Sequence, residues 1–305
     1  MPAGALRSEL LKTRLDRFTR ALLGVEHGEL RSIHRARVES RRLRELVPVI
    51  RLDVHDAKKL AKRLRRVTDR LGSVRELDVL LLLIDELHES RPGLDRALER
   101  VGVVVSKTRD DARKRMFERL PMDQMWRIAR KLDRIVGQLR GDEERSRLRT
   151  VPAGRAERWA VEARAAHRAV RLQAAVRTAG AVYLPERLHA VRIALKKLRY
   201  ALELSAELAG HKKTTPMFHT LRREQNVLGR MHDLQVLIDQ VREVQASLSP
   251  PNVGAWRELD ALVVALEDDC RRLHGRYVRD RDKLMSITNR LVARTPIPAQ
   301  GRRAG

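Results

Sequence analysis

An eleven-residue segment that occurs twice is the strongest constraint on what this chain can fold into. The first copy, from His34 to Arg44, reads HRARVESRRLR, and the second, from His189 to Arg199, reads HAVRIALKKLR. The histidine, the arginine three residues later, and the leucine and arginine at the end of the segment are identical in both copies. The match indicates that the chain carries two related halves, and that both halves face the same anionic partner.

The spacing within this segment is that of an amphipathic helix. At about 100° per residue, the histidine and the residues at +3 and +7 fall within roughly 60° of one another. The apolar residues at +2 and +9 gather on an adjoining face, so the helix buries one side and directs a row of cations to the other. Like charges at this spacing cost a helix a few tenths of a kcal/mol per pair. We therefore favour a binding surface over a merely solvated face, although the second interpretation stays open.

A second matched block supports the duplication. Leu71–Leu80 reads LGSVRELDVL, and Leu228–Leu237 reads LGRMHDLQVL. Further basic residues correspond in and before this block: His219 stands for Lys62, Arg223 for Arg66, and His232 for Arg75. We expect the glycine of each block to permit close helix packing.

These motifs resemble those of the CHAD family, the conserved-histidine α-helical domains. The resemblance covers roughly residues 5 to 292, and it implies an all-α fold of two tandem four-helix bundles related by pseudo-twofold symmetry. It also implies binding of inorganic polyphosphate. The second copy has His219 and His232 where the first has the permanent cations Lys62 and Arg75. The charge at these two positions therefore depends on pH. The expected polyphosphate-binding residues are His34, Arg37, Arg41, Arg42, Arg44, Lys62, Arg66, Arg75, His189, Arg192, Lys196, Lys197, Arg199, His219 and Arg223. We expect both halves to line one basic channel.

Helical periodicity runs through almost the whole chain, interrupted by proline and glycine. We expect a first repeat over 5–140, whose last helix at 122–140 is a bridge, and a second repeat over 156–292. The stretch from Gly141 to Arg155 reads as the seam between them, and residues 293–305 as a disordered tail. The expected helices are 5–23, 29–47, 55–89, 93–119, 122–140, 156–179, 185–209, 215–247 and 254–291.

The charge balance points to polyanionic partners. The 65 lysines and arginines exceed the 40 acidic residues, for a formal net charge of +25. The electrostatic field of such a net charge attracts polyanions, so it indicates the kind of partner and says nothing about the fold. Cys270 is the single cysteine, and the longest aliphatic run, Val79–Ile84, is far shorter than the ~20 residues that cross a bilayer. We expect a cytoplasmic protein without membrane insertion, associated with polyphosphate granules.

Two other functions compete with polyphosphate binding. The dipeptides His55-Asp56 and His232-Asp233 are of the kind that ligates metal in helical phosphohydrolases, but the second aligns with Arg75-Glu76 and the first begins a helix. We therefore expect no enzyme, no metal and no cofactor. Non-specific binding to a nucleic-acid backbone stays open on charge, although only Tyr200 near the motifs could stack on a base. The sequence leaves undecided the preferred polyphosphate length, the oligomeric state, and whether the role is storage, targeting or regulation.

Overall fold

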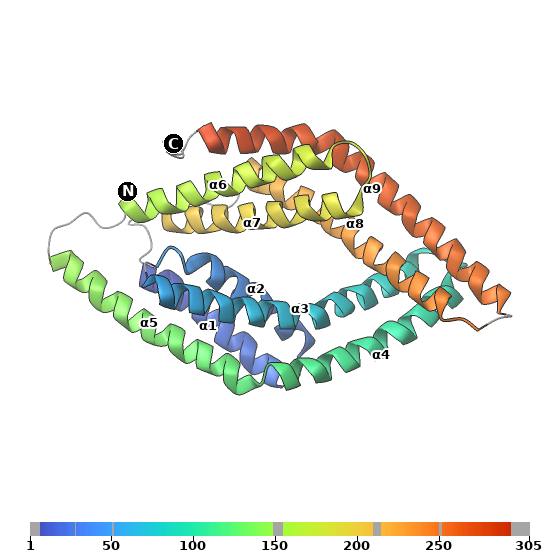
Figure 1. The fold of residues 1–305 in the computed structure, drawn as a ribbon, viewed down its shortest axis with the longest axis horizontal. Helices are drawn as coiled ribbons and strands as arrows, with labels where there is room; N and C mark the ends of the chain where they lie inside the picture. The colour runs from blue at the N-terminus through green and yellow to red at the C-terminus, as the bar shows by residue number, and fades with distance from the viewer. Residues whose placement is uncertain are drawn as a thin grey trace, which may run out of the picture. The chain divides into compact units, whose positions relative to one another are not determined.

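The computed structural model describes residues 7–27, 29–50, 52–148, 155–209, 215–249 and 252–293. Within these ranges the chain forms nine α-helices and no strand (Figure 1), which confirms the all-α prediction. The helices are α1 (Arg7–Glu26), α2 (Leu30–Leu46), α3 (Val54–Ser90), α4 (Asp95–Arg119), α5 (Met122–Leu148), α6 (Arg155–Ala179), α7 (Pro185–Ala209), α8 (Pro216–Ala246) and α9 (Val253–Ala293). Residues 294–305 of the expected tail lie outside the described residues.

The fifth helix is longer than expected. The sequence predicts an end at residue 140, yet α5 continues through Gly141 to Leu148. Glu143, which is buried in this extension, accepts hydrogen bonds from the backbone nitrogen of Ser8 at 3.1 Å and from its Oγ at 2.5 Å. These bonds tie the extension of α5 to α1, and Gly141 lies within the helix instead of ending it. The seam that the sequence predicts to begin at Gly141 therefore begins after Leu148.

Helix packing divides the chain into two compact units, and α8 and α9 contribute to both. Unit 1 contains the described residues of 150–230 and 273–293, and unit 2 those of 7–149 and 231–272. This division differs from the repeats expected from the sequence, because the distal part of α8 and the proximal part of α9 group with unit 2 and not with the rest of the second repeat. The duplication itself stays a prediction from the matched motifs.

The core of unit 2 is built on α1, α2, α3 and α5. Phe18, Ile33, Leu43 and Leu64 are among its fully buried side chains. On α3 the buried positions change side along the helix: Leu60, Leu64, Val67, Leu71, Val74 and Asp78 follow a spacing of four and three, and then Leu80, Leu83, Ile84 and Leu87 take over. Leu71 and Leu80 are nine residues apart, which is about 180° of helical rotation. The helix therefore buries opposite faces before and after Asp78.

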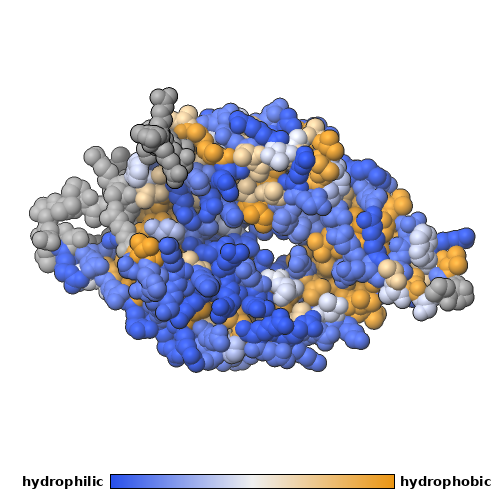
Figure 2. Space-filling model, viewed as in Figure 1, coloured by the Kyte–Doolittle hydropathy of each residue, from blue (hydrophilic) through white to orange (hydrophobic). Residues whose placement is uncertain are grey.

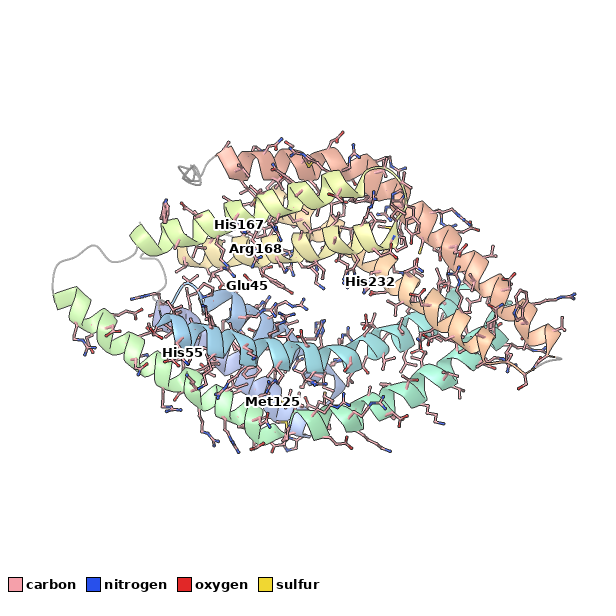
Figure 3. All side chains as sticks on the ribbon, viewed as in Figure 1. Glu45, His55, Met125, His167, Arg168 and His232 are labelled. Carbon is pink, nitrogen blue, oxygen red and sulfur yellow. The ribbon has the colours of Figure 1, made fainter. Side chains whose placement is uncertain are left out.

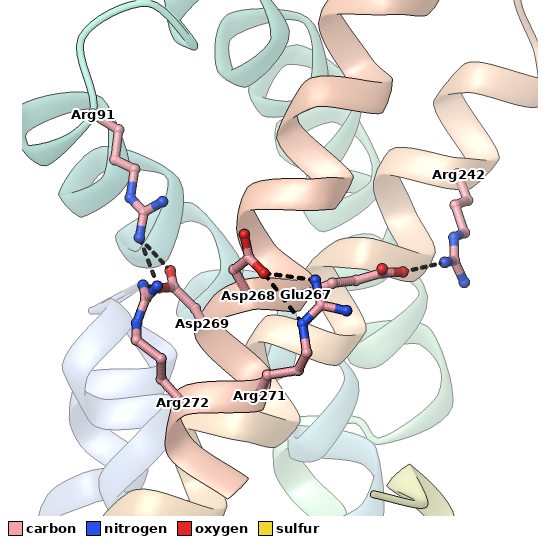
Figure 4. Close-up of polar contacts among 7 residues, drawn as sticks. All are labelled: Arg91, Arg242, Glu267, Asp268, Asp269, Arg271 and Arg272. Atoms are coloured by element: carbon pink, nitrogen blue, oxygen red, sulfur yellow. Dashed lines mark hydrogen bonds and ion pairs between the residues drawn. The ribbon is translucent and has the colours of Figure 1, made fainter. Parts of the chain in front are cut away.

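An ion-pair network ties the end of α3 to α9 within unit 2 (Figure 4). One guanidinium nitrogen of Arg91, Nη2, donates to both carboxylate oxygens of Asp269 at 2.7 Å, and Arg272 also contacts this carboxylate. Because Asp269 is largely covered by its neighbours, we expect this pair to contribute more than an exposed one. The same figure shows two further pairs, Asp268 with Arg271 and Glu267 with Arg242.

The core of unit 1 is formed by α6 and α7 with the proximal part of α8 and the distal part of α9. Tyr277 on α9 is fully buried, and Gln173 on α6 donates a hydrogen bond to Asn289 on α9 at 2.6 Å. The turn after α6 passes through Gly180, whose φ of 63° is unfavourable for other residues. In neither unit is a described helix both long enough and apolar enough to cross a membrane.

Candidate functional site

The burial of α2 follows the amphipathic pattern predicted for the motif helix. Ile33, Ala36 and Leu43 are buried, His34 is exposed, and the side chains of the +3, +7 and +10 arginines are half-buried. The cations therefore lie on the side of α2 that the core leaves open. Figure 2 shows that hydrophilic side chains predominate, in this view, over the region where α5 and the first part of α3 lie in Figure 1.

Arg37, the +3 arginine of the first motif, rests on the glycine of the first LG block. A methyl group added to Gly72 would lie 3.3 Å from Nε of Arg37 and 3.6 Å from its Nη2. The glycine therefore makes room for a motif arginine as well as for close packing of α3 against α2. At Gly229, its counterpart on α8, nothing lies within 4 Å of the added methyl.

Two of the predicted cations on α2, Arg42 and Arg44, interact with nearby carboxylates. Nη1 of Arg42 donates to the buried carboxylate of Glu39 at 2.7 Å, and Arg14 on α1 contacts the same carboxylate at 3.6 Å. Burial lowers the pKa of Arg44, which Glu45 opposes. Arg42 thus supports the helix from its flank, whereas His34, Arg37 and Arg41 form the stripe and Arg44 lies at its end.

The structure separates the predicted cations of α3. Lys62 and Arg66 are exposed, on the side of α3 opposite the core. Arg75 is half-buried and lies nine residues beyond Arg66, which turns it by about 180°. It lies near Asp78. Burial raises the pKa of Asp78, and the positive charge of Arg75 opposes this rise. The first LG block therefore does not continue the exposed row that Lys62 begins.

In unit 1, α7 repeats the arrangement of α2. Val191, Leu195 and Leu198 are buried, while His189 and Lys197 are exposed and Arg192 and Lys196 are half-buried. Arg199 is held in place: its guanidinium donates to the buried Glu203 at 2.5 Å and to Gln225 at 2.7 Å. Tyr200 lies 5.0 Å below this guanidinium and is itself buried.

On α8, His219 is exposed, whereas Arg223 bridges two carboxylates. Its Nε donates to Glu224 at 3.2 Å and its Nη2 to Asp280 on α9 at 3.0 Å. Burial raises the pKa of Glu224, the nearby negative charge of Asp280 adds to this rise, and Arg223 opposes it. Lys283 donates to Asp280 and holds the pKa of that carboxyl low. Because Arg223 is paired with these two carboxylates, we expect it to bind an external anion less strongly than the arginines of the stripes do.

The two His-Asp dipeptides lie in different settings, and Figure 3 labels the histidine of each. His55 lies in the first turn of α3, which Asp53 caps, and Asp56 is paired with Lys131 at 2.6 Å. Nε2 of His232 lies 3.6 Å from Glu76, so the two LG blocks meet within unit 2. Over the part of the chain that the structure describes, no group of three or more His, Cys, Asp or Glu side chains could hold a metal ion.

Comparison with known proteins identifies the family. A sequence model of the CHAD domain matches residues 9–242. The chain belongs to the CHAD-domain family. Two solved structures share the fold: the CHAD domain from the plant Ricinus communis, at 21% identity and a TM-score of 0.61 over 95% of this chain and 93% of that one, and PptA from Streptomyces chartreusis, at 17% and 0.59 over 95% and 100%. No curated protein matches the sequence.

This CHAD domain also contains basic residues that the motifs do not point to. Arg109 and Arg113 on α4 lie near enough to Asp78 to oppose its rise in pKa. The two are four residues apart on one helix face, so their spacing is visible in the sequence. The sequence does not reveal that they lie near the LG block, because this proximity depends on how α4 packs against α3.

The two LG glycines of the CHAD domain provide a matched test of packing. Alanine is favoured over glycine in a helix by up to ~1 kcal/mol. We expect Gly229→Ala to raise the free energy of unfolding by about this amount, and Gly72→Ala to raise it less, since its methyl displaces the Arg37 guanidinium. Denaturant unfolding of both variants measures the difference. An equal gain in the two variants would show that the Arg37 side chain can move aside without loss of stability.

The Glu224 carboxyl should give the CHAD domain a measurable pH dependence. Its pKa is higher in the folded than in the unfolded chain, so its stabilising contribution is present below the unfolded pKa and is lost as pH rises through the folded one. Glutamine can accept the hydrogen bond from Arg223 as the carboxyl does, and it stays neutral at every pH. We therefore expect Glu224→Gln to become more stable relative to wild type as pH rises from about 4 to 8. A difference that does not vary with pH would contradict the assignment.

Proposed function

We propose that this CHAD domain binds inorganic polyphosphate without hydrolysing it, through the basic stripes on the sides of α2 and α7 that the core leaves open. The α2 stripe consists of His34, Arg37 and Arg41, and the α7 stripe of His189, Arg192, Lys196 and Lys197. The observation that carries the proposal is the repeated arrangement: each stripe projects from a helix whose other side is buried in its own unit. Family membership supports the same ligand.

The chemistry of the stripes suits a chain of phosphates. Arginine offers a planar set of donors that can bind two oxygens of a phosphate group, whereas lysine supplies a compact charge. A neutral histidine can still donate one hydrogen bond. Because polyphosphate carries a charge on each phosphate and no bases, its affinity should come from these bonds and from the release of condensed cations.

The pairing of the other cations refines the set of residues that bind the ligand. Arg42 and Arg199 donate to buried glutamates, so we assign both to holding the stripes in place. Arg44 lies at the end of the α2 row. Lys62, Arg66 and His219 are exposed, and they add to the surrounding field. Arg223 is shared with Asp280 and contributes less.

A nucleic-acid backbone is the competing ligand. Single-strand binders stack bases on aromatic side chains, but Tyr200, the aromatic residue next to the second motif, is buried against Arg199. We therefore expect polyphosphate to displace duplex and single-stranded DNA at equal phosphate and salt concentrations. Preference for DNA in this competition would favour the alternative.

Reversal of one charge in each stripe tests the proposed surface. Arg41→Glu with Lys196→Glu changes the +7 position of both motifs and leaves the Arg37–Gly72 contact intact. We expect polyphosphate affinity to fall at least tenfold, or ~1.4 kcal/mol, because repulsion replaces attraction in both stripes. Calorimetric titration at fixed salt provides the measurement.

A matched control separates these stripes from the general field. Arg130→Glu with Arg171→Glu makes the same change of net charge at exposed positions of α5 and α6, one in each unit. This control should lose much less affinity. Equal losses in the two double variants would mean that the protein is a diffuse polycation and that the stripes are not the site.

The absence of turnover is a separate prediction. Hydrolysis of a phosphoanhydride requires a positioned water and, in most enzymes, a metal held by carboxylates. The stripes contain cations, and Glu39 on α2 is buried beneath Arg42. We expect no phosphate release from polyphosphate with Mg²⁺ or Mn²⁺ above a buffer control. Release that is lost in Asp56→Asn or Asp233→Asn would instead establish an enzyme.

A further inference from the structure

The first half of α9 carries an apolar face that unit 2 leaves uncovered. Val253, Trp256 and Val264 are each about half exposed. At about 100° per residue they fall within roughly 80° of one another, and the exposed Asp260 lies among them. Isolated exposed apolar side chains are ordinary, but a group on one face is typical of an interaction site. We call these four residues the α9 face.

The α9 face lies in the acidic part of a basic protein. Residues 76–106 and 231–272, which belong to unit 2, together hold 15 acidic and 7 basic residues. This leaves 58 of the 65 basic and 25 of the 40 acidic residues to the rest of the chain. Ion pairs join the two segments, Arg91 with Asp269 at 2.7 Å and Arg96 with Glu258 at 3.6 Å. Although Arg257 lies at the edge of the α9 face, the surrounding field is negative and attracts a basic surface.

A face of the opposite charge lies on α6 in unit 1. Trp159 is 55% exposed and Val170 is 37% exposed. The exposed Arg171 and Arg177 lie with them within roughly 120° of the helix circumference. Glu162 is also exposed, but it falls outside this range. These residues, Trp159, Val170, Arg171 and Arg177, form the α6 face, which is apolar and basic where the α9 face is apolar and acidic.

The two faces contain two of the three tryptophans of the chain. Trp256 and Trp159 are each about half exposed, whereas tryptophan is on average highly buried. Tryptophan is also enriched among the few residues that carry most of the binding energy of protein interfaces. At 1.5 Å per residue, the α6 face extends for ~27 Å and can cover the ~17 Å of the α9 face.

We propose that the α9 face of one copy of this protein docks on the α6 face of a second copy. Trp256 and Trp159 are the apolar anchors of this contact, and Arg171 and Arg177 of the second copy meet the negative charge around the α9 face. Because every copy offers both faces, the contact is head-to-tail and can add further copies. It does not depend on the binding of polyphosphate.

The overall charge of the protein sets the conditions for this association. Each copy has a formal net charge of +25, so two copies repel one another at a distance. At ~0.15 M salt the Debye length is about 8 Å, and this repulsion is largely screened. The apolar contacts of the interface are not weakened by salt in this way. We therefore expect association at physiological ionic strength.

Two tryptophan substitutions that leave the net charge unchanged test the contact. In sedimentation velocity at ~0.15 M salt, without polyphosphate, the weight-average mass of the wild type should rise with concentration beyond that of a dimer. Trp256→Gln and Trp159→Gln should each weaken association at least tenfold, because each removes one anchor. An equimolar mixture of the two variants should form dimers and stop there, because it retains a single intact pair of faces.

A matched control and a second pair of variants complete the test. Leu23→Gln changes an equally exposed apolar side chain on α1, outside both faces, and should associate as the wild type does. Far-UV circular dichroism checks that each variant is folded. If a tryptophan variant is not folded, Val264→Gln or Val170→Gln takes its place, since both side chains are exposed on the same faces.

The outcomes separate this contact from its alternatives. A wild type that stays monomeric, or tryptophan variants that associate as the wild type does, would overturn the proposal. If Trp256→Gln alone is monomeric while Trp159→Gln associates normally, the α9 face pairs with itself and the α6 face is not its partner. A mixture that remains monomeric would also contradict the head-to-tail contact. None of these results bears on the polyphosphate stripes, because neither tryptophan belongs to them.

Discussion

The burial of apolar side chains beneath the cationic stripes is the interaction on which the site depends. On α2, the arginines at +3, +7 and +10 repel one another, at a cost of about 0.2–0.5 kcal/mol for each close pair. Ile33, Leu43 and Leu46 on the opposite side are almost fully buried, and each contributes roughly 1.5–3 kcal/mol on transfer from water. Packing therefore outweighs the repulsion severalfold, and α2 keeps its row of cations without acidic residues among them. The same comparison holds for α7, with Val191, Leu195 and Leu198.

Buried acids divide the basic residues of the chain into two kinds. Glu39, Glu203 and Glu224 are buried, and each accepts a hydrogen bond from an arginine of the predicted set. Removal of one partner from such a pair would leave the other charge buried and uncompensated, at considerable cost. Arginines of this first kind fix helix positions. The remaining cations of the predicted set are exposed or half-buried.

Much of the fold could be read from the sequence, because it rests on local rules. Proline and glycine ended the expected helices near their observed ends, and the 3.6-residue period placed the buried side of α2 and α7. Tertiary contacts decided the rest. The extension of α5 depends on Ser8 of α1, and the inward position of Arg199 depends on Gln225 of α8. Lys62 and Arg75 appeared equivalent in the sequence, yet the change of buried face on α3 separates them.

The division of the chain into units has a consequence for biosynthesis. Unit 2 is discontinuous: its first part ends by residue 149, and its second part, residues 231–272, follows most of unit 1. Asp269, the partner of Arg91, is thus translated 178 residues later. At the ~5–20 residues per second of translation, the interval between residues 148 and 272 lasts roughly 6 to 25 s. During that time Arg91 and Glu76 have been synthesised without Asp269 and His232, their ion-pair partners on α9 and α8. Unit 2 therefore cannot complete its contacts until α9 has been synthesised.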